Sequence, residues 1–279
     1  LDSVHSQPRM KIALGIEYVG CHYSGWQRQD CIATVQETLE TALSEVADQP
    51  VSVICAGRTD TGVHAIQQVV HLEPSIDRPV QAWVLGTNTK LPNDIAVTWA
   101  KPIADDFHAR FSALKRTYQY IILNRRARPG LLNGMVTWEC RELDLERMST
   151  AARTFVGEHD FTSFRAVACQ AKSPVREVFS LKVDKVSEYF IITITANAFL
   201  HHMVRNIAGV LIAIAQGKED IAWAAEVLAA KDRTVGGVTA PADGLYLVNV
   251  SYPDRFDIPM PETLMEKMRF INSDSSNNA

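Results

Sequence analysis

The chain has 279 residues, of which 47% are apolar, and its 28 Lys and Arg residues against 32 Asp and Glu residues give a formal net charge of -4. This length and apolar content can bury a large core and favour two domains, or one domain in two parts. No apolar run approaches the roughly 18 residues of a membrane span, and residues 1–9 lack the apolar segment of a signal peptide, so we expect a cytoplasmic protein without a membrane partner.

The first part of the chain predicts the element order β-α-β-β-α-β. Residues 11–19 place Ile12, Leu14, Ile16 and Tyr18 on one face, a period of two that is typical of a half-buried strand. Thr34 and Glu37 form a capping box that begins a helix, and Pro50 ends that helix. The pattern then predicts strands over residues 51–56, 64–73 and 95–100, and a second helix over residues 79–87.

The second part repeats this element order with longer insertions. Asp144 is predicted to cap a helix, and Gly157 to end it. The remaining pattern predicts strands over residues 116–123, 175–184, 190–197 and 245–250, and helices over residues 203–214 and 220–230.

These elements predict an α+β fold class made of two ferredoxin-like (β-α-β-β-α-β) halves that share an extended, mainly antiparallel sheet. The expected domains are residues 10–105 and residues 106–256, with a linker near residues 101–111 and a cleft between the halves. Residues 257–279 are expected to be a flexible tail, and residues 272–279 are polar and of low complexity.

The cysteines indicate no covalent framework. They are odd in number and scattered without any Cys-x-x-Cys spacing, so neither disulfides nor a thiolate zinc site is predicted. We expect reduced and mostly buried thiols at all five positions: Cys21, Cys31, Cys55, Cys140 and Cys169.

A loop bounded by two glycines, Gly57-Arg58-Thr59-Asp60-Thr61-Gly62, follows the strand predicted at residues 51–56. Glycine permits a sharp turn, which can hold Arg58 and Asp60 outward at the rim of a sheet. A guanidinium favours the ionised form of a neighbouring carboxylate, and an ionised carboxylate suits a nucleophile or a base. The same pair could instead only bridge a tight turn. Asp-Thr-Gly also occurs in aspartic proteases, but the second triplet that a two-lobed protease needs is absent from the chain.

Two local tracts are basic although the whole chain is acidic. Residues 107–138 contain six basic residues and no acidic residue, and residues 161–176 add three basic residues without an acid. Such tracts suit contacts with a phosphate backbone, because each neutralised phosphate releases counterions, although solvated surface charge is the ordinary alternative. The candidate phosphate contacts are Arg110, Lys115, Arg116, Arg125, Arg126, Lys172 and Arg176.

Five ordered segments carry a resemblance to a known family: residues 57–65, 108–113, 116–120, 160–164 and 197–206. Further matches include Tyr-x-Gly-x-x-Tyr-x-Gly-Trp-Gln and Gly-Leu-Tyr-Leu. With these motifs the chain resembles the TruA family of tRNA pseudouridine synthases. The resemblance implies isomerisation of uridine to pseudouridine at positions 38 to 40 of the tRNA anticodon stem-loop. It also implies a homodimer without a cofactor, and the paired ferredoxin-like fold. Because this reaction neither oxidises nor hydrolyses its substrate, no metal is expected either.

Residue roles follow from the resemblance position by position. Asp60 matches the catalytic aspartate, Tyr118 the tyrosine that stacks on the target base, and Arg205 the arginine that pairs with the aspartate. Three further positions complete the expected site, namely Arg58 beside the flipped base, Leu245 near the uracil and His202 in the cleft lining. Thr61 stands where many relatives have alanine, a change that should leave Asp60 undisturbed.

The residue types leave several points of chemistry open. Asp60 could attack C1′, attack C6 or remove the 2′ proton, and the Tyr118 hydroxyl could assist loss of the C5 proton. Adjacent histidines at a helix start are expected to point in different directions, so His201 and His202 are predicted to hold no metal. The alternative to an enzyme is a non-catalytic RNA-binding module of the same sheet architecture. Asp60 favours the enzyme over the binding module, because a carboxylate in a phosphate-binding cleft repels RNA and is of no use to a protein that only binds it.

Overall fold

The computed structural model describes residues 10–166, 169 and 171–262 and shows a mixed α+β fold built on one ten-stranded sheet. The main path through the sheet is β4-β1-β3-β10-β5-β9-β8-β7, with β2 paired to β3 and β6 paired to β5. Most of the pairs are antiparallel. The strands are β1 (Lys11–Tyr18), β2 (Ile54–Cys55), β3 (His64–Leu72), β4 (Ile95–Ile103), β5 (Lys115–Asn124), β6 (Thr137–Glu139), β7 (Gly157–Asp160), β8 (Val175–Val186), β9 (Tyr189–Ala196) and β10 (Leu245–Ser251).

A short parallel pair in the middle of the sheet joins the strands of the N-terminal part to those of the C-terminal part. Strand β10 returns from the end of the chain and lies between β3 and β5, where it pairs with β3 at Tyr246↔His64 and Leu247↔Ala65. With β5 it forms a longer antiparallel pair. Strand β10 therefore brings the loop before β3 close to the middle of β5, although these segments are far apart in the sequence.

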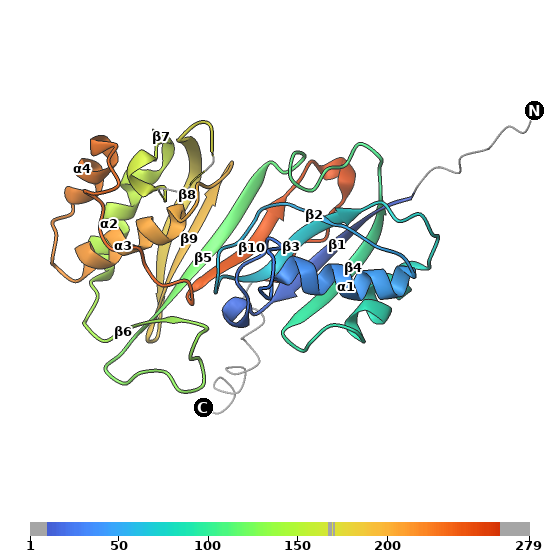
Figure 1. Cartoon of the computed structure of the whole chain (residues 1–279). Coiled ribbons are helices and arrows are strands. Elements are labelled where there is room, and N and C mark those ends of the chain that lie inside the picture. The colour runs from blue at the N-terminus through green and yellow to red at the C-terminus, as the bar shows by residue number, and fades with distance from the viewer. Residues whose placement is uncertain (1–9, 167–168, 170, 263–279) are drawn as a thin grey trace, which may run out of the picture.

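Helices cover the sheet in two groups (Figure 1). Helix α1 (Val35–Ala47) lies over the strands of the N-terminal part, whereas α2 (Leu145–Ala152), α3 (Met203–Ala215) and α4 (Trp223–Ala230) gather at the other end of the sheet. One continuous core of buried apolar side chains lies between the sheet and these helices. A smaller cluster, which includes Ile66, Ile121 and Tyr246, is packed separately. Among the described residues, no helix is long and apolar enough to cross a membrane.

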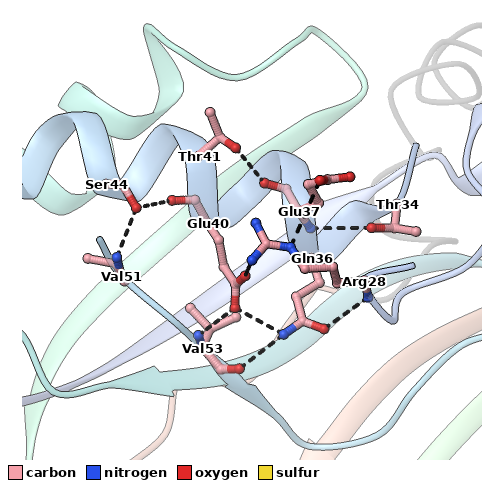
Figure 2. Close-up of polar contacts among 9 residues, drawn as sticks. All are labelled: Arg28, Thr34, Gln36, Glu37, Glu40, Thr41, Ser44, Val51 and Val53. Carbon is pink, nitrogen blue, oxygen red and sulfur yellow. Dashed lines mark hydrogen bonds and ion pairs between the residues drawn. The ribbon is translucent and has the colours of Figure 1, made fainter. Parts of the chain in front are cut away.

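Helix α1 is tied to its surroundings by a buried carboxylate (Figure 2). Thr34 caps the helix as predicted, with its side chain accepting a hydrogen bond from the Glu37 backbone N–H. Glu40 is 3% exposed and accepts hydrogen bonds from the Val53 backbone N–H at 2.9 Å and the Gln36 amide at 3.0 Å. Its other oxygen lies 3.4 Å from the Arg28 guanidinium. Glu40 thus connects α1 to the segments before and after it.

Replacing Glu40 by alanine is expected to lower the free energy of unfolding by about 1 to 3 kcal/mol, because the buried Val53 backbone N–H loses its acceptor. Glu40→Gln keeps an acceptor for Val53 and should lose less. Glu37→Ala is the matched control, because the Glu37 side chain is 44% exposed and lies 3.9 Å from the same Arg28. This substitution should cost under about 1 kcal/mol. Urea unfolding of the three variants gives the measurement. Equal losses for Glu40→Ala and Glu37→Ala would contradict this account.

Several predicted elements of the first part need correction. The strand predicted over residues 51–56 is only two residues long, Ile54–Cys55, because one side of this segment faces α1 and its backbone bonds to side chains there. The second helix contains a π-helical turn, Ala82–Gly86. Strand β4 continues to Ile103 and so occupies the start of the predicted linker, where it pairs with the first residues of β1.

The second part also differs from the prediction in detail. Asp144 caps α2 as predicted, but the helix ends at Ala152 and a 3-10 turn, Arg153–Phe155, follows it. Gly157 does not end the helix; it has a φ of +108° and begins the edge strand β7. The pair β8 and β9 turns at residues 187–188 as predicted.

The cysteines and the end of the chain give two further results. All five cysteines are free, but Cys21, Cys31 and Cys140 are exposed, so the prediction of mostly buried thiols is wrong. The described start of the predicted tail contacts the sheet: the Gln67 amide donates to the Pro259 carbonyl at 2.9 Å. The low-complexity segment at residues 272–279 lies outside the described residues.

Candidate active site

A cleft of about 1060 Å³ opens near the middle of the sheet, where the N-terminal strands meet the C-terminal strands. Its walls come from the loop between β2 and β3, the middle of β5, the first residue of β10 and the start of α3. These are the segments that β10 brings together. The cleft contains all six residues expected at the site, which are Arg58, Asp60, Tyr118, His202, Arg205 and Leu245.

The cleft is strongly basic. Among the described residues that line it, one is acidic, Asp60, and five are arginines: Arg58, Arg110, Arg116, Arg176 and Arg205. A concave wall of one charge sign concentrates the field and attracts a polyanion, even on a chain whose net charge is negative. The cleft is therefore suited to a phosphate-bearing ligand, with one carboxylate placed inside it.

The loop that carries Asp60 is anchored on both sides of the carboxylate. The Thr59 carbonyl accepts a hydrogen bond from the buried Trp26 N–H at 3.0 Å, and the Thr59 hydroxyl lies 2.7 Å from the Tyr18 hydroxyl. After Asp60, the Val63 N–H closes a turn onto the Asp60 carbonyl at 3.1 Å. Gly62 has a φ of +80° in that turn, a conformation that glycine adopts without strain. The carboxylate is thus held in place by its backbone.

Three cationic or ionisable side chains from one short segment surround the Asp60 carboxylate. His201 Nε2 lies 3.1 Å from one oxygen, while His202 Nε2 and Arg205 Nη1 lie 3.5 Å and 3.9 Å from the other. The pairing of Arg205 with Asp60 that the resemblance implies is therefore present at ion-pair distance. The expectation that the two histidines point in different directions is wrong, because both rings face Asp60 with their centroids 4.1 Å apart.

The backbone at the start of α3 explains this convergence. His202 has a φ of +63°, a left-handed conformation that is uncommon for a residue with a side chain and recurs at functional sites. This turn brings the His202 ring back beside His201 and starts the helix that carries Arg205. Burial lowers the pKa of His202, which favours its neutral ring, although the negative charge of Asp60 opposes this. The contact of His201 with Asp60 was not predicted from the sequence.

The Asp60, His201 and His202 side chains are also able to hold a metal ion. Their ligand atoms all lie within 4.8 Å of one another, and imidazole nitrogen with carboxylate oxygen is a common donor set. Arg205 approaches the same carboxylate at 3.9 Å, and its charge opposes a bound cation. The geometry therefore permits a metal at this position, but the neighbouring arginine supplies a positive charge there without one.

Tyr118 and Leu245 form the apolar side of the cleft. Tyr118 packs edge to face on Phe199, with ring centroids 5.0 Å apart, and both lie in the cleft wall. Leu245 is buried at the start of β10, the strand that pairs with β5. Burial, with the negative charge of Asp60 as a smaller cause, raises the pKa of Tyr118. The phenol is therefore protonated at neutral pH, which weakens the idea that its hydroxyl removes a proton.

Tyr118→Phe is therefore expected to retain most of the activity, because the ring stays in place and the phenol is not a ready base. Tyr118→Leu should lose the stacking on the target base that the resemblance implies, a contribution of roughly 1 to 3 kcal/mol, and fall about 5- to 150-fold in turnover. Single-turnover rates for both variants on tRNA are the measurement. If both variants were as active as the native protein, Tyr118 would not contact the reacting base.

Arg116 acts as a brace of the cleft wall. Its guanidinium donates hydrogen bonds to four backbone carbonyls, those of Ala56, Arg110, Ala113 and Asn197, at 2.8 to 3.3 Å. These acceptors belong to separate segments, so Arg116 fixes their relative positions. Because its donors are already engaged, this geometry disfavours the phosphate contact expected of Arg116.

The other candidate phosphate contacts divide into two groups. Arg110 and Arg176 lie in the cleft lining, although Arg176 already donates to the Ser173 and Val175 carbonyls. Four candidates, which are Lys115, Arg125, Arg126 and Lys172, lie outside the residues that line the cleft. Of these, Arg125 pairs with Glu188 at 3.3 Å, and the Lys115 ammonium lies 4.7 Å from the centroid of the Phe179 ring.

A basic cleft that holds one carboxylate and an aromatic ring suits an enzyme whose substrate is a nucleic acid. The family model described as tRNA pseudouridine synthase matches residues 15–112 and 151–253. The chain belongs to the tRNA pseudouridine synthase family.

Curated relatives are similar over nearly their whole length. A tRNA pseudouridine synthase A of Nitrosococcus oceani is 58% identical over 90% of this chain and 96% of its own. Those of an Enterobacter strain and of Salmonella arizonae are 55% and 56% identical, over 94% and 92% of this chain and 97% and 95% of theirs. A crystal structure of a Cbf5-Nop10-Gar1 complex matches 72% of this chain and 45% of that chain at 9% identity and a TM-score of 0.35, too low to carry an argument.

Proposed function

We propose that this protein isomerises uridine to pseudouridine in tRNA, at positions 38 to 40 of the anticodon stem-loop, with Asp60 as the catalytic residue. The observation that carries the proposal is the placement of one anchored carboxylate in a cleft lined by five arginines. The relatives named tRNA pseudouridine synthase A support the reaction. The positions in the stem-loop rest on the family resemblance alone.

The cleft suits a nucleotide that has left its helix. A uridine inside a stem is out of reach, so it must be flipped out at a cost of a few kcal/mol. Stacking against the ring of Tyr118 offsets part of this cost, and Leu245 adds an apolar surface beside it. The exposed Arg58, two residues from Asp60, is placed to contact the backbone or the neighbouring base of the flipped nucleotide.

The isomerisation exchanges one bond for another. The bond between N1 and C1′ breaks, the uracil turns, and C5 bonds to C1′; C5 then loses its proton and N1 gains one. Nothing is oxidised or hydrolysed, and we propose that neither a cofactor nor a metal takes part. Asp60 acts as a nucleophile at C1′ or C6, or as the base for the 2′ proton, and all three roles use the carboxylate that His201 and Arg205 contact.

Release of tritium from tRNA labelled at C5 of uridine tests this function directly, because the proton at C5 is lost only when the new bond forms. We expect release from tRNAs that carry uridine at positions 38 to 40 and none from tRNAs that lack it there. A protein that binds tRNA but releases no tritium from any tRNA would be the non-catalytic binding module instead.

Salt dependence separates backbone contacts from groups at the reaction centre. Each arginine or lysine that neutralises a phosphate contributes about 0.7 to 0.9 to the slope of log affinity against log salt. Arg126→Ala is therefore expected to flatten this slope by about that amount while leaving the single-turnover rate at saturating tRNA unchanged. Binding of native and variant protein across a salt series is the measurement. An unchanged affinity and slope would remove Arg126 from the footprint.

We also propose that the chain consists of two ferredoxin-like halves, residues 10–105 and 106–256, and acts as a homodimer in the cytoplasm. The strand orders β4-β1-β3-β2 and β10-β5-β9-β8 support the two halves, because each follows the same sequence of elements. The dimer rests on the family resemblance, and the compartment rests on the expectation from the sequence. Analytical ultracentrifugation of the free protein tests the dimer.

A further inference from the structure

Phe111 is the most exposed aromatic residue among those that the structure describes, at 76% exposure. It lies in the loop between β4 and β5, next to Arg110, which lines the cleft. Two other residues of this loop, Phe107 and Ala109, are fully buried. The loop therefore points one aromatic ring into the core and holds another at the surface beside a basic cleft.

The loop is held rigidly although Phe111 is exposed. His108 Nδ1 accepts hydrogen bonds from the backbone N–H groups of Arg110 and Phe111, each at 3.2 Å. A second histidine, His71, accepts a hydrogen bond at Nδ1 from the Ala109 backbone N–H at 3.1 Å. Burial lowers the pKa of His71 to about 4, so its ring is neutral at pH 7 and able to accept this bond. The Tyr252 hydroxyl donates to the Ala109 carbonyl at 2.6 Å. These hydrogen bonds fix the backbone that carries the exposed Phe111 ring.

The ring itself is also oriented. Its centroid lies 4.2 Å from that of His108 at an interplanar angle of 30°, so His108 supports one side of the ring. The Arg110 guanidinium carbon lies over the Phe111 ring, 5.6 Å from its centroid, and Phe111 nevertheless stays 76% exposed. The Arg116 guanidinium donates a hydrogen bond to the Arg110 carbonyl at 2.8 Å, which connects Arg110 and Phe111 to the cleft wall. An exposed aromatic face with a guanidinium beside it is the arrangement that proteins use to bind unpaired bases and the adjoining phosphate.

We propose that Phe111 is a stacking platform for one unpaired nucleobase of the bound RNA, with Arg110 contacting a phosphate of the same strand. The inference rests on the proposed function, because it takes tRNA as the ligand of the cleft. It adds a contact outside the six residues of the expected site. RNA is the favoured occupant over a second copy of this chain because the residues that join Phe111 to the cleft are arginines.

Stacking and charge contacts give different signatures in a salt series. Phe111→Leu keeps an apolar side chain but removes the aromatic face, and should weaken tRNA binding about 5- to 150-fold at every salt concentration. Arg110→Ala should instead flatten the slope of log affinity against log salt by about 0.7 to 0.9. Phe111→Tyr keeps the ring and should bind as the native protein does. Leu85→Ala, which truncates another apolar residue at 66% exposure, is the control and should change neither quantity.

Tritium release and ultracentrifugation on the same variants separate the outcomes. If Phe111→Leu binds tRNA with native affinity while the native protein releases tritium, the platform is refuted and the proposed function stands. If the native protein binds tRNA without releasing tritium but Phe111→Leu weakens binding as stated, the proposed function fails and the platform stands. A change in oligomeric state for Phe111→Leu would show that Phe111 contacts a second copy of the chain, which also refutes the platform.

Discussion

Asp60→Asn is expected to reduce pseudouridine formation to background, a loss of at least about 10⁴-fold, while tRNA affinity stays within a few-fold of native. The amide keeps the shape of the carboxylate and can still accept hydrogen bonds, but it is neither a nucleophile nor a base of useful strength. Asp60 is the one acid among the described residues that line the cleft, so its neutralisation also removes a repulsion toward RNA phosphates. Binding should therefore be unchanged or slightly tighter.

Single-turnover tritium release at saturating tRNA, with a separate binding titration, measures both quantities. Asp60→Glu is the matched variant, because it keeps the charge and moves the carboxylate away from the anchored backbone by one methylene; it should retain trace activity. Thermal unfolding checks the fold, since the Asp60 side chain is 23% exposed and also pairs with His201. If Asp60→Asn lost tRNA binding and turnover in equal measure, the role of Asp60 would be structural.

Local pattern was sufficient to predict most of the sheet and the loop that carries Asp60. The strand β1 and the Thr34 cap of α1 depend on neighbours a few residues apart, and both lie where they were predicted. The prediction that β1 is half-buried is wrong, because residues on both of its faces are buried. The loop was recognisable because glycines flank a charged pair, and Gly62 does take a left-handed conformation. The length of β2 was not predictable, because the residues around it bond to Glu40 and Ser44 on α1.

The arrangement around Asp60 depended on contacts that no local pattern contains. The approach of His201 follows from the left-handed backbone of His202, which a sequence does not reveal in a residue other than glycine. Arg116 belongs to a basic tract of the sequence, which predicted a phosphate contact. In the structure its guanidinium instead donates hydrogen bonds to four backbone carbonyls. Charge alone does not distinguish a side chain that meets RNA from one that holds loops together, because the difference lies in which acceptors the fold places within reach.

Arg205→Ala is expected to lower the single-turnover rate at saturating tRNA about 10²- to 10³-fold, with a smaller effect on affinity. Arg205 is 16% exposed at its side chain, lies 3.9 Å from the Asp60 carboxylate and donates from Nε to the Ala240 carbonyl at 2.8 Å. Its loss therefore removes a positive charge next to the carboxylate that we propose as the reacting group. Arg205→Lys keeps the charge, but a single ammonium cannot make both contacts, so its rate should fall between native and alanine.

A matched control separates this electrostatic role from the support of the loop around Ala240. Arg233 braces the same loop, with hydrogen bonds to the Gly236 and Gly237 carbonyls and to the Thr239 hydroxyl. Arg233→Ala should therefore lower the unfolding temperature as Arg205→Ala does, yet lose far less rate, because the charge beside Asp60 remains. Equal rate losses in the two variants would assign the effect of Arg205 to the loop, and a full rate in Arg205→Ala would refute its catalytic pairing with Asp60.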